Sequence, residues 1–204
     1  MKKILVMIIV SQLIFASMDG QEVTIGVFTH APHVYKTSSN EPYGPAVEYI
    51  KNVVTAMGYK PNIQLLPLSR ILSYLKSGEI DISLELLKTE DRETFLFDPE
   101  HPTYTMVQSL TVLSTNKLNE IQSINDLDNT KVGYLFGANI GPFLSSSSAI
   151  QFEFVSGDDW IQKNLAKLLA GRIDAALDNN AYSYLAEAKK QGVDDKIKTI
   201  PLPG

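Results

Sequence analysis

Apolar residues recur along the chain with two alternating periods. Runs that are β-branched or that alternate between apolar and polar positions predict strands, and runs with helical spacing of apolar residues predict helices. Strands are expected at residues 22–28, 62–66, 80–83, 104–114, 131–136, 151–155, 173–177 and 197–200. Helices are expected at residues 45–57, 68–76, 142–145, 160–169 and 181–190. Because strands and helices alternate, we expect an α/β protein with mostly parallel sheets flanked by helices.

A polar segment divides this pattern into two halves. Residues 116–129 are rich in turn-forming residues, and the alternation of strands and helices begins again at Lys131. We therefore expect two lobes, one over residues 21–108 and one over residues 109–200.

Residues 1–20 have the form of a secretory signal peptide. Two lysines, Lys2 and Lys3, precede an almost unbroken apolar run from Ile4 to Ala16, and small or polar residues follow it. The run is shorter than the roughly 20 residues that span a bilayer. The alternative is a buried helix at the start of the fold, but nothing amphipathic follows the run. We expect cleavage of this segment and a periplasmic mature protein that does not span the membrane.

The composition is that of an ordinary globular protein, with 44% hydrophobic and 20% charged residues. The net charge is -5 and no run of lysine or arginine occurs, which argues against a nucleic-acid partner. The chain has no cysteine, so disulfides, cysteine-bound zinc and a lipid-anchored N-terminal cysteine are excluded. The mature protein is expected to fold by its hydrophobic core alone.

Three ordered groups of residues carry a more specific signal. They are residues 25–44; residues 67–70, 75–81, 89–93 and 97–98; and residues 131–137 with 171–176. This order resembles the family 3 extracellular solute-binding proteins of bacteria, over essentially all of residues 21–204. The resemblance implies a periplasmic-binding-protein-like (type II) fold, in which two α/β lobes joined by a hinge hold a ligand between them.

The resemblance also implies a function and a set of partners. Such proteins bind a small polar solute, an amino acid or a related carboxylate, and deliver it to the permease of an ABC transporter. No cofactor is expected, and the mature chain is expected to be a monomer. Members of the family return to the first lobe through a second hinge strand. Residues 201–204 are therefore expected to begin that return, with the rest of the first lobe absent.

Two arginines are candidates for holding a carboxylate, because a planar guanidinium can donate two parallel hydrogen bonds to it. Arg92, at the end of residues 89–92, matches the position of that arginine in the family; the alternative is a surface residue paired with a neighbouring acid. Arg70 lies near a second family position, and Leu68 stands there in place of a tryptophan. The alternative for Arg70 is a solvated helix face.

Glu85 and His30 depart from the pattern of an amino-acid receptor. Glu85 stands in an apolar run where relatives carry small hydroxyl residues, and a buried carboxylate needs a cation or a donor. We expect it to bind amine or hydroxyl groups of the ligand or, alternatively, to pair with Arg92 or Arg70. His30 stands where relatives stack an aromatic ring on the ligand. With His33 it could suggest a metal site, but the chain has only three histidines and no cysteine, so no metal is expected.

Asn139 and Asp178 are the candidates in the second lobe. Asn139 follows Gly137 between a strand and a helix, where backbone N–H groups and the helix dipole favour an anion; the alternative is a simple helix N-cap. The acid that holds an α-amino group in relatives would fall at Asn179, so Asp178 stands one residue early. A shift of one residue on a strand turns a side chain to the opposite face. Asp178 is expected to reach the ligand only if the following loop compensates.

Two other functions stay open. The same module can act as a soluble ligand-sensing partner of a signalling protein, and some proteins of this fold are periplasmic dehydratases. A dehydratase needs a positioned general acid, and Glu85 is the one residue that fits that role. No second catalytic partner occurs at a recognisable spacing, so we expect binding without catalysis.

Overall fold

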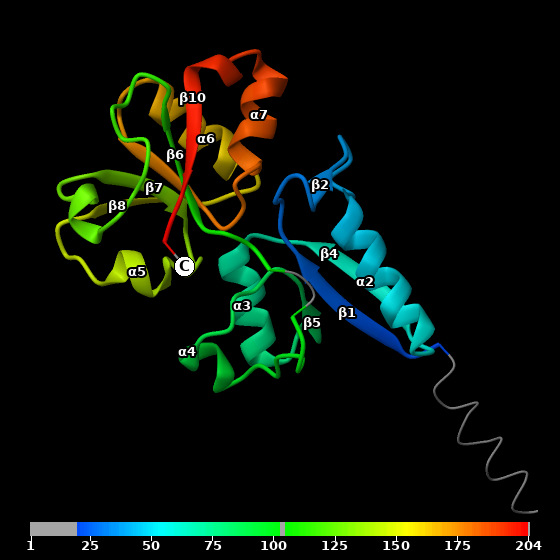
Figure 1. Ribbon diagram of the computed structural model, residues 1–204. Helices are drawn as coiled ribbons and strands as arrows, with labels where there is room; N and C mark the ends of the chain where they lie inside the picture. Colours follow the sequence, from blue (N-terminus) through cyan, green and yellow to red (C-terminus); the bar gives the residue numbers. More distant parts are fainter. Residues whose placement is uncertain (1–19, 103–104, 204) are drawn as a thin grey trace, which may run out of the picture.

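The computed structural model describes residues 20–102 and 105–203, so the predicted signal peptide, apart from Gly20, lies outside the described residues. The first part of the chain forms β1 (Glu22–Val27), β2 (Tyr35–Lys36), β3 (Pro42–Tyr43), α2 (Pro45–Ala56), β4 (Lys60–Leu65), α3 (Leu68–Ser77), β5 (Ile82–Ser83) and α4 (Glu90–Glu93). The second part forms β6 (Ser109–Leu113), η1 (Ile124–Leu127), β7 (Lys131–Leu135), α5 (Gly141–Ser145), β8 (Gln151–Val155), α6 (Trp160–Leu169), β9 (Ala175–Asp178), α7 (Ser183–Gln191), η2 (Asp194–Lys196) and β10 (Ile197–Pro201). In Figure 1 the second part lies at the upper left, and α3 of the first part lies next to it; we call the two parts the first lobe and the second lobe.

The first lobe is built on a parallel sheet with strand order β4-β1-β5. Apolar residues of α2 pack on one face of β1, where Ile25 and Val27 are buried. Gly26 faces the other side, because a Cβ on this glycine would lie 2.8 Å from Ile80 Cδ1 and 3.2 Å from Ile71 Cγ1 of α3. Helices therefore cover the sheet on both faces, as the alternating pattern predicted.

The second lobe holds a five-stranded sheet with strand order β10-β6-β9-β7-β8. β7 is parallel to β8 and to β9, whereas β6 is antiparallel to β9 and to β10. The pairing of β6 with β10 runs from Leu113 and Ile197 to Ser109 and Pro201. The amide of Leu202 then donates to the carbonyl of Gln108 at 2.8 Å, so the two segments stay hydrogen-bonded just beyond the paired strands.

The expected fold class is confirmed, and the elements differ from the sequence pattern at a few places. Of the run expected at residues 104–114, only Ser109 onward forms a strand; the described residues before it, 105–108, connect the two lobes and do not pair in a sheet. The loop expected between β1 and α2 contains a short hairpin, β2 and β3, with Tyr35 opposite Tyr43. The division at residues 108 and 109 and the return of residues 201–204 to the first lobe stay predictions.

The helices can also be compared with the length and hydropathy that a membrane-spanning helix needs. None of the helices within residues 20–102 and 105–203 combines the length and the hydropathy that a membrane crossing requires.

The packing of α6 leads to a prediction about stability. Leu165 is fully buried in the core of the second lobe, whereas Leu185 on α7 is 41% exposed. We expect Leu165→Ala to lower the free energy of unfolding by about 2–5 kcal/mol, because it leaves a cavity, and Leu185→Ala to change it by less than about 0.5 kcal/mol. Urea unfolding followed by the fluorescence of Trp160, in the same lobe, measures both. Equal losses in the two variants would show that α6 does not pack as described.

Candidate functional site

A small cavity lies where the two lobes meet. The first lobe lines it with Phe28, His30, Leu68, Glu85, Leu86, Leu87 and Arg92, and the second lobe with Tyr134, Leu135, Ala138, Asn139, Trp160, Asp178 and Asn179. Its volume is about 20 Å³, room for about one water molecule. Phe28 and Leu68 also pack into the hydrophobic core of the second lobe. The structure therefore shows the two lobes closed on one another.

The topology explains why these residues meet. Phe28, Leu68 and Glu85 follow the carboxyl ends of the parallel strands β1, β4 and β5. In the second lobe, Asn139 and Asp178 lie at the carboxyl ends of β7 and β9, which are also parallel. The carboxyl ends of parallel strands form the usual ligand-binding edge of an α/β sheet. Here the two edges face each other.

The cavity brings together all but one of the residues predicted for the site. His30, Leu68, Glu85, Arg92, Asn139 and Asp178 line it. Arg70 does not, since it is an exposed residue of α3, as the alternative of a solvated helix face would have it.

His30 lies between two carboxylates that come from different lobes. Its Nδ1 is 2.9 Å from Glu85 Oε2, and its Nε2 is 3.0 Å from Asp178 Oδ1. Since both ring nitrogens face carboxylate oxygens, both donate, and the ring is an imidazolium. Burial alone would lower the pKa of His30, which is only 3% exposed. The charges and hydrogen bonds of Asp178 and Glu85 outweigh this and raise the pKa to about 10.

The ring of His30 is fixed by its surroundings. It is stacked with Phe28 and His33, with ring centroids 5.8 and 5.9 Å away, and Trp160 lies 5.9 Å away at a tilt. The backbone amide and carbonyl of His30 both bond to Val34. The ring therefore contacts protein groups on its faces and at both nitrogens, and this environment differs from the ligand stacking predicted for it.

Glu85 sits in a strained backbone conformation with its side chain 1% exposed. Its φ is 61°, which non-glycine residues seldom adopt outside constrained sites. Besides the bond to His30, its Oε1 lies 3.2 Å from His33 Nδ1. Among the described residues, the ion pairs of Glu85 are thus with histidines, and the alternative pair with Arg92 or Arg70 is not seen there.

His33 is held by a residue of the second lobe as well as by Glu85. The Oδ1 of Asn180 accepts from the amide of Tyr182 at 2.9 Å, which leaves its Nδ2 to donate to His33 Nε2, also at 2.9 Å. The Nδ1 of His33 faces Glu85. Within residues 20–102 and 105–203, no group of three or more acidic or histidine side chains is arranged to hold a metal ion.

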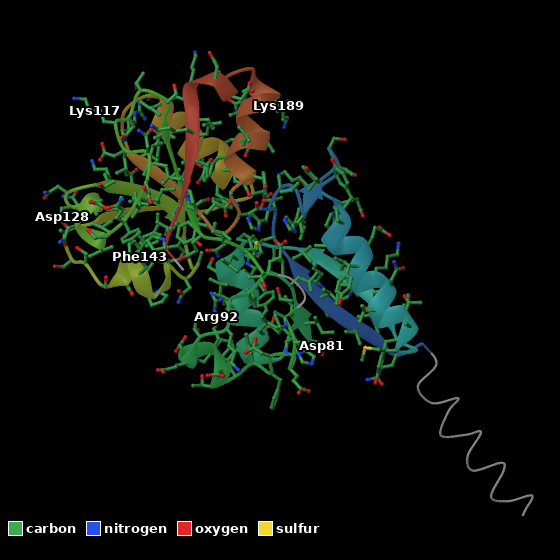
Figure 2. All side chains as sticks on the ribbon, in the orientation of Figure 1. Asp81, Arg92, Lys117, Asp128, Phe143 and Lys189 are labelled. Carbon is green, nitrogen blue, oxygen red and sulfur yellow. The ribbon has the colours of Figure 1, made fainter. Side chains whose placement is uncertain are left out.

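Arg92 is a buried cation whose described partners are neutral. It is 7% exposed, and the hydroxyl of Thr89 accepts from its backbone amide at the start of α4. Its Nη1 donates to the carbonyl of Leu87 at 2.9 Å, and its Nη2 to the carbonyl of Gly137, in the other lobe, at 3.3 Å. Figure 2 shows Arg92 where the first lobe faces the second.

No ion pair in the described part of the chain includes Arg92. Burial lowers the pKa of Arg92, while Tyr134, Asp91 and Asp98 oppose the shift. A guanidinium has five N–H donors and stays charged at ordinary pH. It therefore retains donors that the two carbonyls do not use.

Asp178 faces the cavity although it stands one residue early in the family pattern. It is the last residue of β9, so the strict alternation of strand faces no longer governs Asn179, and both residues line the cavity. The Oδ1 of Asp178 accepts from His30, whereas its Oδ2 is buried without a partner among the described residues. Asn179 instead accepts a hydrogen bond from Gln108 at 2.8 Å.

Asn139 has a local structural role. Its Oδ1 accepts from the amide of Gly141 at 2.7 Å, at the start of α5. This helix is only five residues long, so its dipole is weak and the expected anion site at its N-terminus lacks support. The N-cap residue of α5 is Ile140, without a side-chain cap bond, so Asn139 holds the turn before the helix and its contact with a ligand stays a prediction.

Further contacts between the lobes involve residues that the sequence did not single out for the site. The Nε1 of Trp160 donates to the carbonyl of Thr29 at 2.9 Å, and the hydroxyl of Thr29 donates to the carbonyl of Asp158 at 2.6 Å. Lys36 pairs with the carboxylate of Asp158 at 2.8 Å. The apolar spacing around Trp160 indicated only a core position, because a helical pattern carries no sign of a second lobe that packs on it.

Comparison with known proteins places this geometry among binding proteins. The family model described as "Bacterial extracellular solute-binding proteins, family 3" matches residues 23–198. No curated protein matches the chain by sequence.

Several solved structures share the fold. An ancestral arginine-binding protein bound to arginine has a TM-score of 0.73 at 21% identity, covering 88% of this chain and 78% of that one. A structure from work on glutathione import via GshT and the cystine ABC importer TcyBC of Streptococcus mutans has a TM-score of 0.75 at 23% identity, with 91% and 77% covered. The amino acid ABC transporter substrate-binding protein AbpA from Streptococcus pneumoniae, bound to L-arginine, has a TM-score of 0.71 at 21% identity, with 92% and 78% covered.

The buried imidazolium leads to a prediction about pH. The pKa of His30 rises from its ordinary value of 6.5 to about 10 on folding, so its contribution to stability is complete below pH 6.5 and is lost as the pH rises toward 10. We expect the free energy of unfolding to fall across this window in the native protein and to change much less in His30→Gln. His101→Gln, which replaces an exposed histidine, is the matched control and should follow the native curve. Urea unfolding at pH 6, 8 and 9.5 gives the three curves, and parallel curves for His30→Gln and His101→Gln would contradict the assignment.

Proposed function

Since this chain belongs to the bacterial extracellular solute-binding proteins of family 3, we propose that it binds an amino-acid-type zwitterion between its lobes for delivery to an ABC importer. The observation that carries the proposal is a pair of polar groups in the cavity whose hydrogen-bonding capacity is incompletely used. Arg92 has no carboxylate partner in the described part of the chain, and Asp178 Oδ2 is buried without a hydrogen bond there.

A zwitterion can bind to Arg92 and to the second oxygen of Asp178 at the same time. The guanidinium of Arg92 can hold a carboxylate with two parallel bonds, and the second oxygen of Asp178 can accept from an ammonium group. Buried charges are costly unless they are paired and hydrogen-bonded. A solute that carries both signs therefore satisfies the cavity better than an anion or a cation alone.

The cavity also indicates how such a solute would enter. About 20 Å³ is far less than an amino acid occupies, so the lobes must part before it binds. The segment at residues 105–108, just before β6, connects the lobes and can act as the hinge. Closing around the solute then follows from the higher affinity of the closed form.

The similar structures support the same class of solute. Two of the three reported above are described as bound to arginine, and the third comes from work on glutathione import. These proteins share the fold at 21–23% identity, so they support an amino-acid-type solute without indicating which one. The signal-like residues 1–20 and the extracellular nature of the family favour the periplasm as the place of action.

Binding without turnover is part of the proposal. Glu85 was the one candidate for a general acid, and its two oxygens face the rings of His30 and His33. Both oxygens therefore already contact protein groups, which leaves this side chain poorly placed to act on a solute. The family and its structural neighbours are likewise binding proteins.

The proposal predicts the effect of changing Arg92. Arg92→Gln should weaken the binding of an amino acid by about 2–5 kcal/mol, because the ligand carboxylate loses its charged partner. Arg172→Gln, which replaces an exposed arginine, should leave affinity unchanged. The ligand is first found by thermal-shift screening of the twenty common L-amino acids, and calorimetry then measures the variants.

Three outcomes of this experiment would count against the proposal. No amino acid stabilises the protein; the deaminated analogue of the best ligand binds as tightly as the amino acid itself; or the ligand is recovered chemically changed.

A further inference from the structure

We propose that His30 is a positioning residue of this site, which draws the lobes together through Asp178 and makes their closure depend on a proton. The inference rests on the proposed function in one respect, because the closure that His30 controls is that of the same ligand cavity. It concerns a residue whose ring is enclosed by protein groups and which therefore acts through another side chain rather than on the ligand.

The first step concerns which bonds survive when the lobes part. His30 and Glu85 belong to the first lobe, so their 2.9 Å contact persists in an open form. Asp178 belongs to the second lobe, so the 3.0 Å contact to His30 is broken. The ring then loses one of its two carboxylates and gains water, and its pKa moves back toward the ordinary value. A form with the higher pKa binds more protons, so closing takes up a proton between the two pKa values.

The second step concerns charge. Among the described residues, the titratable groups that face His30 are Glu85 of the first lobe, Asp178 of the second lobe and the ring of His33. Trp160 and Phe28 complete the enclosure, and neither titrates. With the proton, a cation lies between two anions. Without it, two carboxylates face each other across a neutral ring in a buried place, so attraction becomes repulsion.

The third step concerns the ligand. His30 uses Oδ1 of Asp178, whereas Oδ2 is the oxygen proposed for the ammonium group. The ring and the ligand can therefore share this carboxylate, and the bond to His30 fixes its orientation. Protonated His30 should then favour ligand binding. A ring that competed with the ligand would have the opposite effect, because binding would tighten as the proton left.

The protein carries its own reporter of closure. Trp160 is the only tryptophan in the sequence. It is 2% exposed, and its Nε1 bonds to Thr29 of the other lobe. Parting the lobes breaks this bond and admits water to the ring, which shifts its emission to longer wavelength.

The first arm of the test uses the ligand-free mature chain from pH 5.5 to 8.5. Tryptophan emission and the radius of gyration from X-ray scattering are recorded for the native protein, His30→Gln, Asp178→Asn and the exposed control His101→Gln. The native protein and the control should open as the pH rises, with longer-wavelength emission and a larger radius. Both site variants should be open throughout. The inference fails if the native protein and Asp178→Asn give the same emission and radius at every pH.

The variant Asp178→Asn keeps the first arm informative even if His30→Gln fails to fold. Asp178→Asn removes the partner in the second lobe and keeps the pair of His30 with Glu85, so it stays informative if His30→Gln does not fold.

The second arm uses L-arginine as the probe, or the best amino acid from the screen. Its Kd in the native protein should rise with pH by up to tenfold per pH unit, the limit for one linked proton, and should be nearly flat in His30→Gln. Affinity that increases with pH in the native protein would overturn the inference. If no amino acid binds while the first arm shows proton-linked closure, the proposed function fails and the role of His30 stands.

Discussion

The imidazolium of His30 is held between Glu85 and Asp178, two carboxylates from different lobes, in a place that water scarcely reaches. A buried charge is tolerated only when its partners are close and well oriented, and each neighbouring feature meets that condition. The turn from His30 to Val34 fixes the ring, the left-handed backbone of Glu85 brings its carboxylate beneath it, and β9 ends where Asp178 must face the cavity. These contacts join the two lobes at the cavity, and each of them requires the others to be in place.

Most of the fold could be predicted from the sequence because its signals are local. Pro45 begins α2 and Gly78 ends α3 in the left-handed conformation, as their residue types indicate. The apolar spacing of α6 gives its buried face in the same way. Strand pairing is different, since nothing local shows that β6 and β10 would pair antiparallel with a separation of more than eighty residues. The hairpin of Tyr35 and Tyr43 was not predicted for a related reason, because strands of two residues are too short to show an alternating pattern.

The sequence predicted which residues would line the site but not which hydrogen bonds they would make. Resemblance to a family indicated which residues would gather, and six of the seven line the cavity. It could not indicate that His30 would bond to side chains 55 and 148 residues away, because such pairing depends on the three-dimensional approach of two lobes. Arg70 shows the opposite error: a plausible residue type one turn into α3 points to solvent. Asn139 likewise lines the cavity as predicted, but its side chain accepts a hydrogen bond from the nearby backbone amide of Gly141.

The pairing of β6 with β10 has a mechanical consequence for how the molecule moves. Five register pairs, from Leu113 with Ile197 to Ser109 with Pro201, hold both strands within the second sheet. The hydrogen bond from Leu202 to Gln108 extends this pairing by one more residue on each side. The bend that the proposed opening requires is therefore expected before Ser109, on the first-lobe side of the paired strands, rather than within them. Because Asp178 is paired with Ser109 in the same sheet, it lies close to this bend, and a small rotation there changes its distance to His30 only slightly compared with residues at the outer edge of the lobe.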